Sequence, residues 1–308
     1  MKTILATAYA INPFKGSEDG MGWNFVCQIA RFNRVIAVTR ENNREHIEKY
    51  MFQNPSPDYA NIQFLYYDLP YWMRFWKKGG RGAMLYYWMW QRGMPSFVKS
   101  QKLQYDIVHN LNFHNDWTPS YLWKLGKPMV WGPVGHHPLI PAQYLAPYPL
   151  SYWLKDRMAW LVKNFFWKFS PALKTTIRKA DKVLCMNSEV APKLRLSESQ
   201  IVTMPSVATE NLGWEEQRNS NQFTILTAGR LVPLKGYDLS ILAFSQFLQT
   251  VPLEARAKVQ LLVIGNGEES ERYRKMVSDL HLEANVRFID WVLRADLLEM
   301  YKAALGMS

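Results

Sequence analysis

The sequence predicts an α/β protein made of two doubly wound, Rossmann-like domains. The chain has 308 residues, enough for about two domains that each bury a core. Short apolar runs of strand length alternate with helical patterns, which is typical of parallel sheets with ligand sites at the carboxyl ends of the strands. A polar, turn-rich stretch separates two such series. We therefore expect domains at 1–205 and 223–308, joined by a linker at 206–222.

Each element is expected where an apolar pattern ends in a polar or glycine-containing loop. In the first domain, strands are predicted at 2–8, 35–39, 62–67, 107–109, 129–131, 182–186 and 201–204, helices at 23–32 and 44–51, and a helical segment within 147–181. In the second domain, strands are predicted at 223–228, 260–264 and 286–289, and helices at 237–250, 268–280 and 294–304.

The N-terminus and the cysteines indicate a cytoplasmic protein. The apolar stretch after Lys2 is short for a signal peptide, so it is better explained as a first buried strand. No window approaches ~18 uninterrupted apolar residues, so no membrane-spanning helix is indicated. Cys27 and Cys185 lie far apart without metal-ligand spacing, which fits a reducing compartment.

The charge balance points to anionic partners. The 37 Lys and Arg residues outnumber the 26 Asp and Glu residues, giving a net charge of +11. Nucleotide phosphates, an anionic lipid surface and nucleic acid all match this charge. Aromatic and basic residues together also occur in proteins that bind single-stranded nucleic acid, but no sequence motif supports that reading, and we expect no nucleic-acid partner.

The stretch FTILTAGRLVPLKGYDLSILAFSQF, residues 223–247, has the layout of strand, cationic loop and helix. Such a layout places backbone N–H groups and fixed positive charge beside a phosphate. Gly229 and Gly236 permit tight turns, and Arg230 and Lys235 are close enough in the chain to share one anionic ligand. From spacing alone, a diphosphate site and an ordinary turn with two solvated cations are equally good explanations.

The sequence of this stretch resembles that of the retaining family 4 glycosyltransferases, which have the GT-B fold. There, a GR-x-x-x-x-KG-x-D-x-L-x-x-A-F run follows the first strand of the nucleotide-binding domain. The similarity continues through VQLLVIGNGEES, NVRFIDWV and ADLLEMYKAA, and KPMVWGPVGHHP is similar to part of the opposite domain. The resemblance implies two Rossmann-like domains facing a cleft, and transfer of a sugar from a nucleotide-sugar donor to a hydroxyl acceptor with retention.

The resemblance also implies site residues. Arg230 and Lys235 would neutralise the leaving diphosphate, and His109, in the D-[VI]-V-H segment, would position a sugar hydroxyl. The GSE-x-x-x-GW loop would face the donor phosphates, although a glycine-rich loop alone is weak evidence. The donor-binding residues expected on this basis are Gly16, Ser17, Gly20, Gly22, Gly229, Gly265 and Glu268.

The W-G-P-[VI]-G loop is expected on the acceptor side, with His114, Gly135 and His136 as its candidate residues. His136 stands where many relatives have a second glycine. The adjacent His136 and His137 point apart in an extended segment, which is poor zinc geometry. With two cations balancing the diphosphate, we expect neither a metal nor a cofactor other than the nucleotide-sugar substrate.

Two aromatic segments suggest a peripheral membrane protein at the inner face of the membrane. Residues 66–92 mix aromatic rings with cations, as at a membrane–water interface or in an aromatic-rich core helix pair. In 147–181, a core-facing helix face is predicted at Leu154, Met158, Leu161, Phe165 and Phe169. A second stripe comprises Trp153, Trp160 and Trp167 with Lys163, and it is expected to contact anionic lipid, with a buried second face as the alternative.

Relatives continue with P-S-x-x-E-G-x-G-x-x-x-x-E-A, whose two glutamates bind the donor, and no such pair occurs here. We therefore expect the sequence to be a fragment whose second domain is incomplete. The expected function is glycosyl transfer to a glycan or lipid-linked acceptor in polysaccharide or glycolipid biosynthesis. The alternative is a catalytically inactive, membrane-associated binding protein of the same fold.

Overall fold

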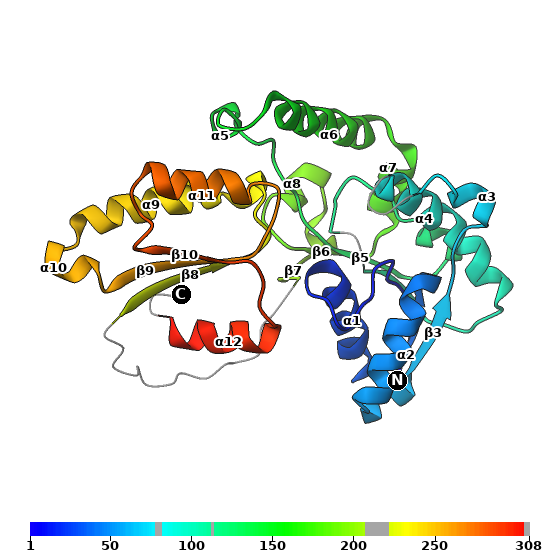
Figure 1. Cartoon of the computed structure of the whole chain (residues 1–308). Coiled ribbons are helices and arrows are strands. Elements are labelled where there is room, and N and C mark those ends of the chain that lie inside the picture. Colours follow the sequence, from blue (N-terminus) through cyan, green and yellow to red (C-terminus); the bar gives the residue numbers. More distant parts are fainter. Residues whose placement is uncertain (78–81, 112–113, 207–221, 305–308) are drawn as a thin grey trace. The chain divides into compact units, whose positions relative to one another are not determined.

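The computed structural model describes residues 1–77, 82–111, 114–206 and 222–304. The chain forms two compact units (Figure 1). Unit 1 contains Met1–Pro141 and Ser151–Ala208, and unit 2 contains Ala142–Leu150 and Thr209–Ser308. Both units are built on parallel sheets, as the sequence predicts for a doubly wound α/β protein.

The sheet of unit 1 has seven strands in the order β3-β2-β1-β4-β5-β6-β7. The order reverses between β1 and β4, the position where open α/β sheets bind ligands at their carboxyl edge. The strands are β1 (Thr3–Thr7), β2 (Arg34–Thr39), β3 (Ile62–Tyr66), β4 (Ile107–Asn110), β5 (Met129–Val134), β6 (Lys182–Cys185) and β7 (Ile201–Thr203).

Alternating side chains of these strands pack into a separate apolar core on each face of the sheet. On one face, Ala6 and Ala37 pack with Trp23 and Val26 of α1 (Ser17–Ala30) and with α2 (Arg44–Gln53). On the other face, Leu5 and neighbouring strand residues pack with α4 (Ala83–Ser100) and α7 (Pro171–Lys179). The remaining helices of unit 1 are α3 (Tyr71–Arg74), α6 (Leu150–Phe169) and α8 (Val190–Leu194), with short 3₁₀ turns at Glu41–Asn43, Pro57–Asn61, Leu122–Leu125 and Glu198–Gln200.

Unit 2 has a three-stranded parallel sheet in the order β10-β9-β8. Its core joins alternate residues of the strands to Ile241 and Phe244 of the first long helix and to Tyr273 and Val277 of the second. The elements are β8 (Phe223–Ala228), α9 (Tyr237–Thr250), α10 (Leu253–Arg256), β9 (Val259–Ile264), α11 (Ser270–Asp279), β10 (Val286–Ile289) and α12 (Arg294–Ala303), with a 3₁₀ turn at Pro233–Lys235.

Unit 2 also contains a segment from the middle of the chain, residues 142–150 with helix α5 (Ala142–Leu145). The Tyr148 hydroxyl donates a hydrogen bond of 2.8 Å to Asp238 Oδ2 in the first turn of α9. The Arg272 guanidinium carbon lies 4.2 Å from the centroid of the Tyr148 ring. The predicted division at 1–205 therefore differs from the structure, because 142–150 packs with the second series of elements.

Predicted and observed elements differ mainly at their ends. The strands at 223–228 and 286–289 and the helix at 237–250 have the predicted bounds. Helix α1 begins at Ser17 rather than at residue 23, so the second half of the glycine-containing loop is helical. Strand β5 continues to Val134, past the Gly132 and Pro133 that were expected to end it.

The two faces of α6 are the reverse of the prediction. The residues predicted to face the core are all exposed: Leu154, Met158, Leu161, Phe165 and Phe169. The predicted membrane stripe instead packs partly against unit 1, where the Trp160 and Trp167 rings contact each other and the His136 ring. Both faces are apolar, so helical periodicity alone could not decide which one is covered.

The aromatic segment 66–92 is divided between core and surface. Tyr86, Tyr87 and Trp90 of α4 are buried in the core of unit 1. Tyr71 and Trp72 of α3 are exposed. Within the described part of the chain, none of the helices combines the length and the hydropathy needed to cross a bilayer.

Candidate active site

The loop after β1 leads into the N-terminus of α1, where the sequence predicts donor contacts. Gly16 is the N-cap residue of α1 and has open space at its Cβ position. A Cβ on Gly20 would overlap the Lys15 carbonyl oxygen, so this position tolerates only glycine without a shift of the backbone. Gly22 is buried in the helix, and the side chain of Ser17 lies outside the described residues.

His114 and Glu18 form a partly buried pair at the same edge of the sheet. Glu18 Oε1 lies 3.9 Å from His114 Nδ1 and accepts a hydrogen bond of 3.4 Å from the His114 backbone N–H. Burial lowers the pKa of His114 to about 4 and raises the pKa of Glu18. His114 Nε2 is buried and has no hydrogen-bond partner among the described residues.

His109 lies inside the sheet on β4 and is 7% exposed. Its Nε2 is 2.8 Å from the Gly132 carbonyl oxygen. A carbonyl can only accept, so Nε2 carries the proton and donates it. Burial lowers the pKa of His109 to about 4, which keeps the ring neutral at pH 7. The His109 side chain thus contacts the backbone at Gly132.

The predicted acceptor-side loop lies beside the segment that follows β4. Gly135 pairs with Asn115 in a parallel bridge, and its N–H donates a hydrogen bond of 3.0 Å to the His114 carbonyl. The next residue, His136, is buried, and its Nδ1 donates to Asp116 Oδ2 at 2.7 Å. Burial raises the pKa of Asp116. The structure thus brings His114, Gly135 and His136 together, and adds Asp116 and Glu18.

Helix α6 covers this loop with the predicted membrane stripe. The Trp167 indole donates to the Asp116 carbonyl at 3.3 Å, and Lys193 Nζ lies 3.6 Å from the Trp167 ring centroid. The charge of Lys163 contributes to the lowered pKa of His137, after burial. Trp160, Trp167 and Lys163 therefore face the loop. Trp153 is more exposed and stacks with the Arg157 guanidinium.

In unit 2, two loops cross closely at the carboxyl edge of the sheet. Gly229 directly follows β8 and Gly265 directly follows β9, with φ angles of 156° and 134°. A Cβ on Gly265 would overlap the Gly229 carbonyl, and a Cβ on Gly267 would overlap the Leu231 carbonyl. These glycines therefore let the two loops pass each other backbone to backbone.

Arg230 and Lys235 follow β8 in this loop, and both are exposed. Neither forms an ion pair with another of the described residues. Gly236 caps the N-terminus of α9 with a φ of 65° and no side-chain cap. Arg230 and Lys235 thus lie in the loop that leads into the N-terminus of α9, and both cations and helix N-termini favour anions.

Glu268 and Glu269 have different environments. Glu268, the predicted donor contact, is exposed. Glu269 is buried, and its carboxylate accepts a hydrogen bond of 2.6 Å from Arg272 Nε. The sequence GNGEES alone does not indicate which of the two adjacent glutamates is buried. Their positions just before α11 decide this in the structure.

Among the described residues, no cluster of His, Cys, Asp and Glu side chains could hold a metal ion.

Comparisons with solved structures identify the fold. WaaG, a glycosyltransferase involved in lipopolysaccharide biosynthesis, matches 98% of this chain and 73% of its own, with 16% identity and a TM-score of 0.54. The catalytic domain of starch synthase IV from Arabidopsis thaliana, bound to ADP and acarbose, matches 98% of this chain and 77% of its own, with 11% identity and a TM-score of 0.58. The chain thus has the GT-B fold of glycosyltransferases.

The second unit also carries a family signature. Residues 208–305 match the family described as glycosyl transferases group 1. The D-inositol 3-phosphate glycosyltransferase of Acidothermus cellulolyticus is 35% identical over 85 residues. That match spans 26% of this chain and 19% of the length of the curated relative.

Proposed function

We propose that the protein transfers a sugar from a nucleotide-sugar donor to a hydroxyl acceptor, with retention at the anomeric carbon. The observation that carries this proposal is the loop between β8 and α9, where the exposed Arg230 and Lys235 precede the N-terminus of the helix. The family of residues 208–305 and the ADP-bound starch synthase of the same fold support a nucleoside diphosphate as the ligand of this site.

The two cations suit the chemistry of glycosyl transfer. The bond between the anomeric carbon and the donor phosphate oxygen breaks, and its electron pair leaves with the diphosphate. Negative charge therefore grows on the diphosphate in the transition state, where fixed positive groups stabilise it most. Arg230 offers a planar fork of donors, and Lys235 offers a compact charge.

In unit 1, we assign the contact with a sugar hydroxyl to His114 rather than His109. His114 Nε2 has no partner among the described residues, whereas His109 Nε2 already donates to Gly132. A neutral His114 ring can donate a hydrogen bond to a hydroxyl or accept one from it, and Glu18 Oε1 lies 3.9 Å from the other ring nitrogen, Nδ1. Gly135 and His136 form the adjacent acceptor-side loop.

We further propose that unit 1 associates with an anionic membrane surface, which suits a lipid-linked acceptor and a position at the inner face of the membrane. The support is the exposed apolar face of α6, which includes Leu154, Met158, Leu161, Phe165 and Phe169. Lys155 and Lys168 lie on the same helix, next to this face, and both are exposed. Apolar side chains bordered by cations are typical of helices that lie in a bilayer interface.

Calorimetry with UDP and GDP tests the proposed diphosphate site. Lys235→Ala and Arg230→Ala each remove a charge-assisted contact worth about 1.5–3 kcal/mol, so affinity should fall about tenfold or more. Lys258→Ala is the matched control, because Lys258 is exposed and precedes β9 at the opposite edge of the sheet. Equal affinity in all three variants would remove Arg230 and Lys235 from the site.

Turnover separates the enzyme from a binding protein of the same fold. The purified protein is incubated with candidate nucleotide-sugars and acceptors, and release of the nucleoside diphosphate is measured. Release that depends on both the acceptor and Lys235 supports transfer. Binding of UDP or GDP without release under any of these conditions would favour a binding protein.

A further inference from the structure

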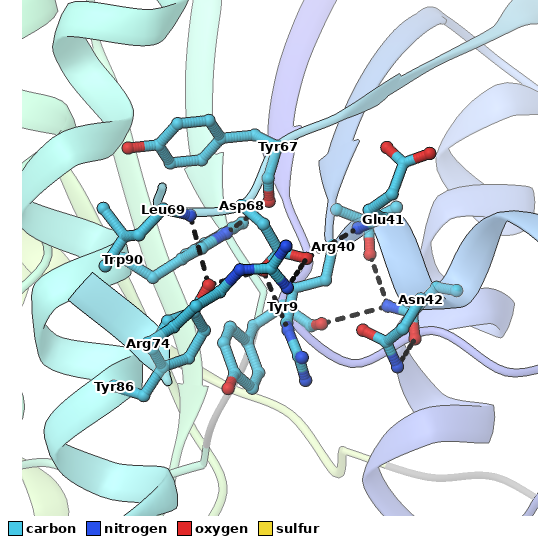
Figure 2. Close-up of polar contacts among 12 residues, drawn as sticks. Tyr9, Arg40, Glu41, Asn42, Tyr67, Asp68, Leu69, Arg74, Tyr86 and Trp90 are labelled. Carbon is cyan, nitrogen blue, oxygen red and sulfur yellow. Dashed lines mark hydrogen bonds and ion pairs between the residues drawn. The ribbon is translucent and has the colours of Figure 1, made fainter. Parts of the chain in front are cut away.

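A second cluster of cations lies in unit 1, at the carboxyl ends of β1, β2 and β3 (Figure 2). Arg40 directly follows β2, and Asp68 follows the end of β3. Arg74 belongs to α3, and Lys77 lies just beyond it. No residue of this cluster has a role in the transfer proposed above.

Asp68 holds the cluster together. Figure 2 shows Arg40, Arg74 and Tyr86 approaching its carboxylate from three different elements. Tyr86 donates a hydrogen bond of 2.6 Å, Arg40 Nε lies at 3.3 Å and Arg74 Nη1 at 3.7 Å. The Glu41 backbone N–H also donates to this carboxylate, at 3.3 Å.

Positive charge exceeds negative charge in the cluster. Three cations, Arg40, Arg74 and Lys77, face the single carboxylate of Asp68. The neighbouring Glu41 carboxylate does not compensate, because it pairs with Arg44 at 2.8 Å. Burial lowers the pKa of Lys77, and the charge of Arg40 lowers it further. The cluster therefore carries two charges in excess in a partly buried place, where repulsion is poorly screened.

The hydrogen-bonding capacity of the cluster is also incompletely used. The Arg74 Nε atom is buried and has no hydrogen-bond partner among the described residues. Leaving a buried charged donor unpaired is unfavourable, so a ligand that accepts from it gains affinity. The Arg74 side chain is 40% exposed, so a ligand can reach it from solvent.

We propose that Arg40, Arg74 and Lys77 form a binding site for a phosphate group. A phosphate dianion would balance the two excess charges, and its oxygens match the planar donor fork of arginine. The phosphate belongs either to a soluble molecule or to a lipid headgroup. The exposed rings of Tyr71 and Trp72 on the same short helix as Arg74 would suit contact with a lipid. If the ligand is the acceptor, that assignment rests on the proposed transfer, whereas the site itself does not.

Calorimetry with inorganic phosphate at constant ionic strength tests the site. The Arg230→Ala/Lys235→Ala protein is the background, so that only unit 1 is measured. Arg74→Gln and Lys77→Gln should each lower the affinity about tenfold, the loss of one charge-assisted contact. Lys99→Gln should leave it unchanged, because Lys99 is exposed in the last turn of α4. Circular dichroism checks that each variant is folded.

Two results would overturn the proposal. One is phosphate affinity in the Arg74→Gln/Lys77→Gln protein equal to that of the background. The other is an equal loss in Lys99→Gln, which would show only a general effect of net charge. Sedimentation with phosphatidylglycerol vesicles then identifies the source. Release from vesicles by inorganic phosphate points to a lipid headgroup, and phosphate binding without release points to a soluble phosphate.

Discussion

Replacement of Tyr148 by phenylalanine should loosen α9 and α11 in unit 2. The Tyr148 hydroxyl is buried, donates to Asp238 at 2.8 Å and lies 3.4 Å from the Tyr273 hydroxyl. Burial raises the pKa of Tyr148, so the hydroxyl remains a donor throughout the physiological range. Tyr148→Phe keeps the ring beside Arg272 and removes the hydroxyl, with its contacts to Asp238 and Tyr273.

The loss should be about 1.5 kcal/mol, the lower end of the range for a hydrogen bond to a charged group. The lower end applies because Asp238 keeps a second partner, Arg272 Nη2, at 3.2 Å. This free energy corresponds to about tenfold faster amide hydrogen exchange wherever local opening breaks the contact. The peptides to follow by mass spectrometry are those of α9 and α11.

Tyr144→Phe is the matched control, because Tyr144 lies in the same segment but is 50% exposed. Exchange in α9 and α11 should be the same in this control as in the unchanged protein. Equal exchange in Tyr148→Phe and Tyr144→Phe would refute the inference that Tyr148 stabilises unit 2. Faster exchange across both units would instead indicate a global loss of stability.

Three further predictions concern lipid binding, acid stability and loop geometry. Leu161→Ser on the exposed face of α6 should lower sedimentation with anionic vesicles about tenfold. Phe52→Ser, at another exposed ring, should not lower it, and equal effects of the two substitutions would exclude α6 as the lipid-binding surface. The pKa of His109 is about 4 in the folded protein and 6.5 when unfolded, so the unfolded state binds more protons between these values. Urea stability should therefore fall by about 3 kcal/mol from pH 7 to pH 4 through this group, and His109→Gln should flatten the profile by that amount. Gly265→Ala should lower the melting temperature more than Gly126→Ala, because a Cβ overlaps backbone only at Gly265, and the reverse order would contradict the crossing of the two loops.

Local signals were sufficient for much of the fold. The strand at 223–228 is a short apolar run bounded by turn residues, and the helix at 237–250 has one apolar face, so each was predicted with the observed bounds. The GT-B fold is confirmed by the structural comparisons. The faces of α6 were predicted wrongly because both are apolar, and only the position of the His136 loop decides which one is covered.

Site partners were harder to predict because the fold brings them from distant positions. Glu18 meets His114 across 96 residues of sequence, and Asp116 meets His136 across 20. Neither spacing corresponds to a helical turn or a hairpin, so no local pattern indicates the pair. The order of strands β1, β4 and β5 in the sheet produces both contacts, and that order is a property of the topology.

The assignment of residues 142–150 to unit 2 affects how the protein can be divided or recombined. A cut or fusion point placed only in the linker at 206–222 would separate Tyr148 from Asp238 of α9 and Arg272 of α11. Tyr148 donates a hydrogen bond to Asp238, and its ring contacts the Arg272 guanidinium. A second unit transplanted as one continuous piece would therefore lack the Tyr148 hydroxyl, and Arg272 would remain as the partner of Asp238. Chimeras with proteins of the same fold should exchange 142–150 together with the second unit, because this unit is discontinuous in the sequence.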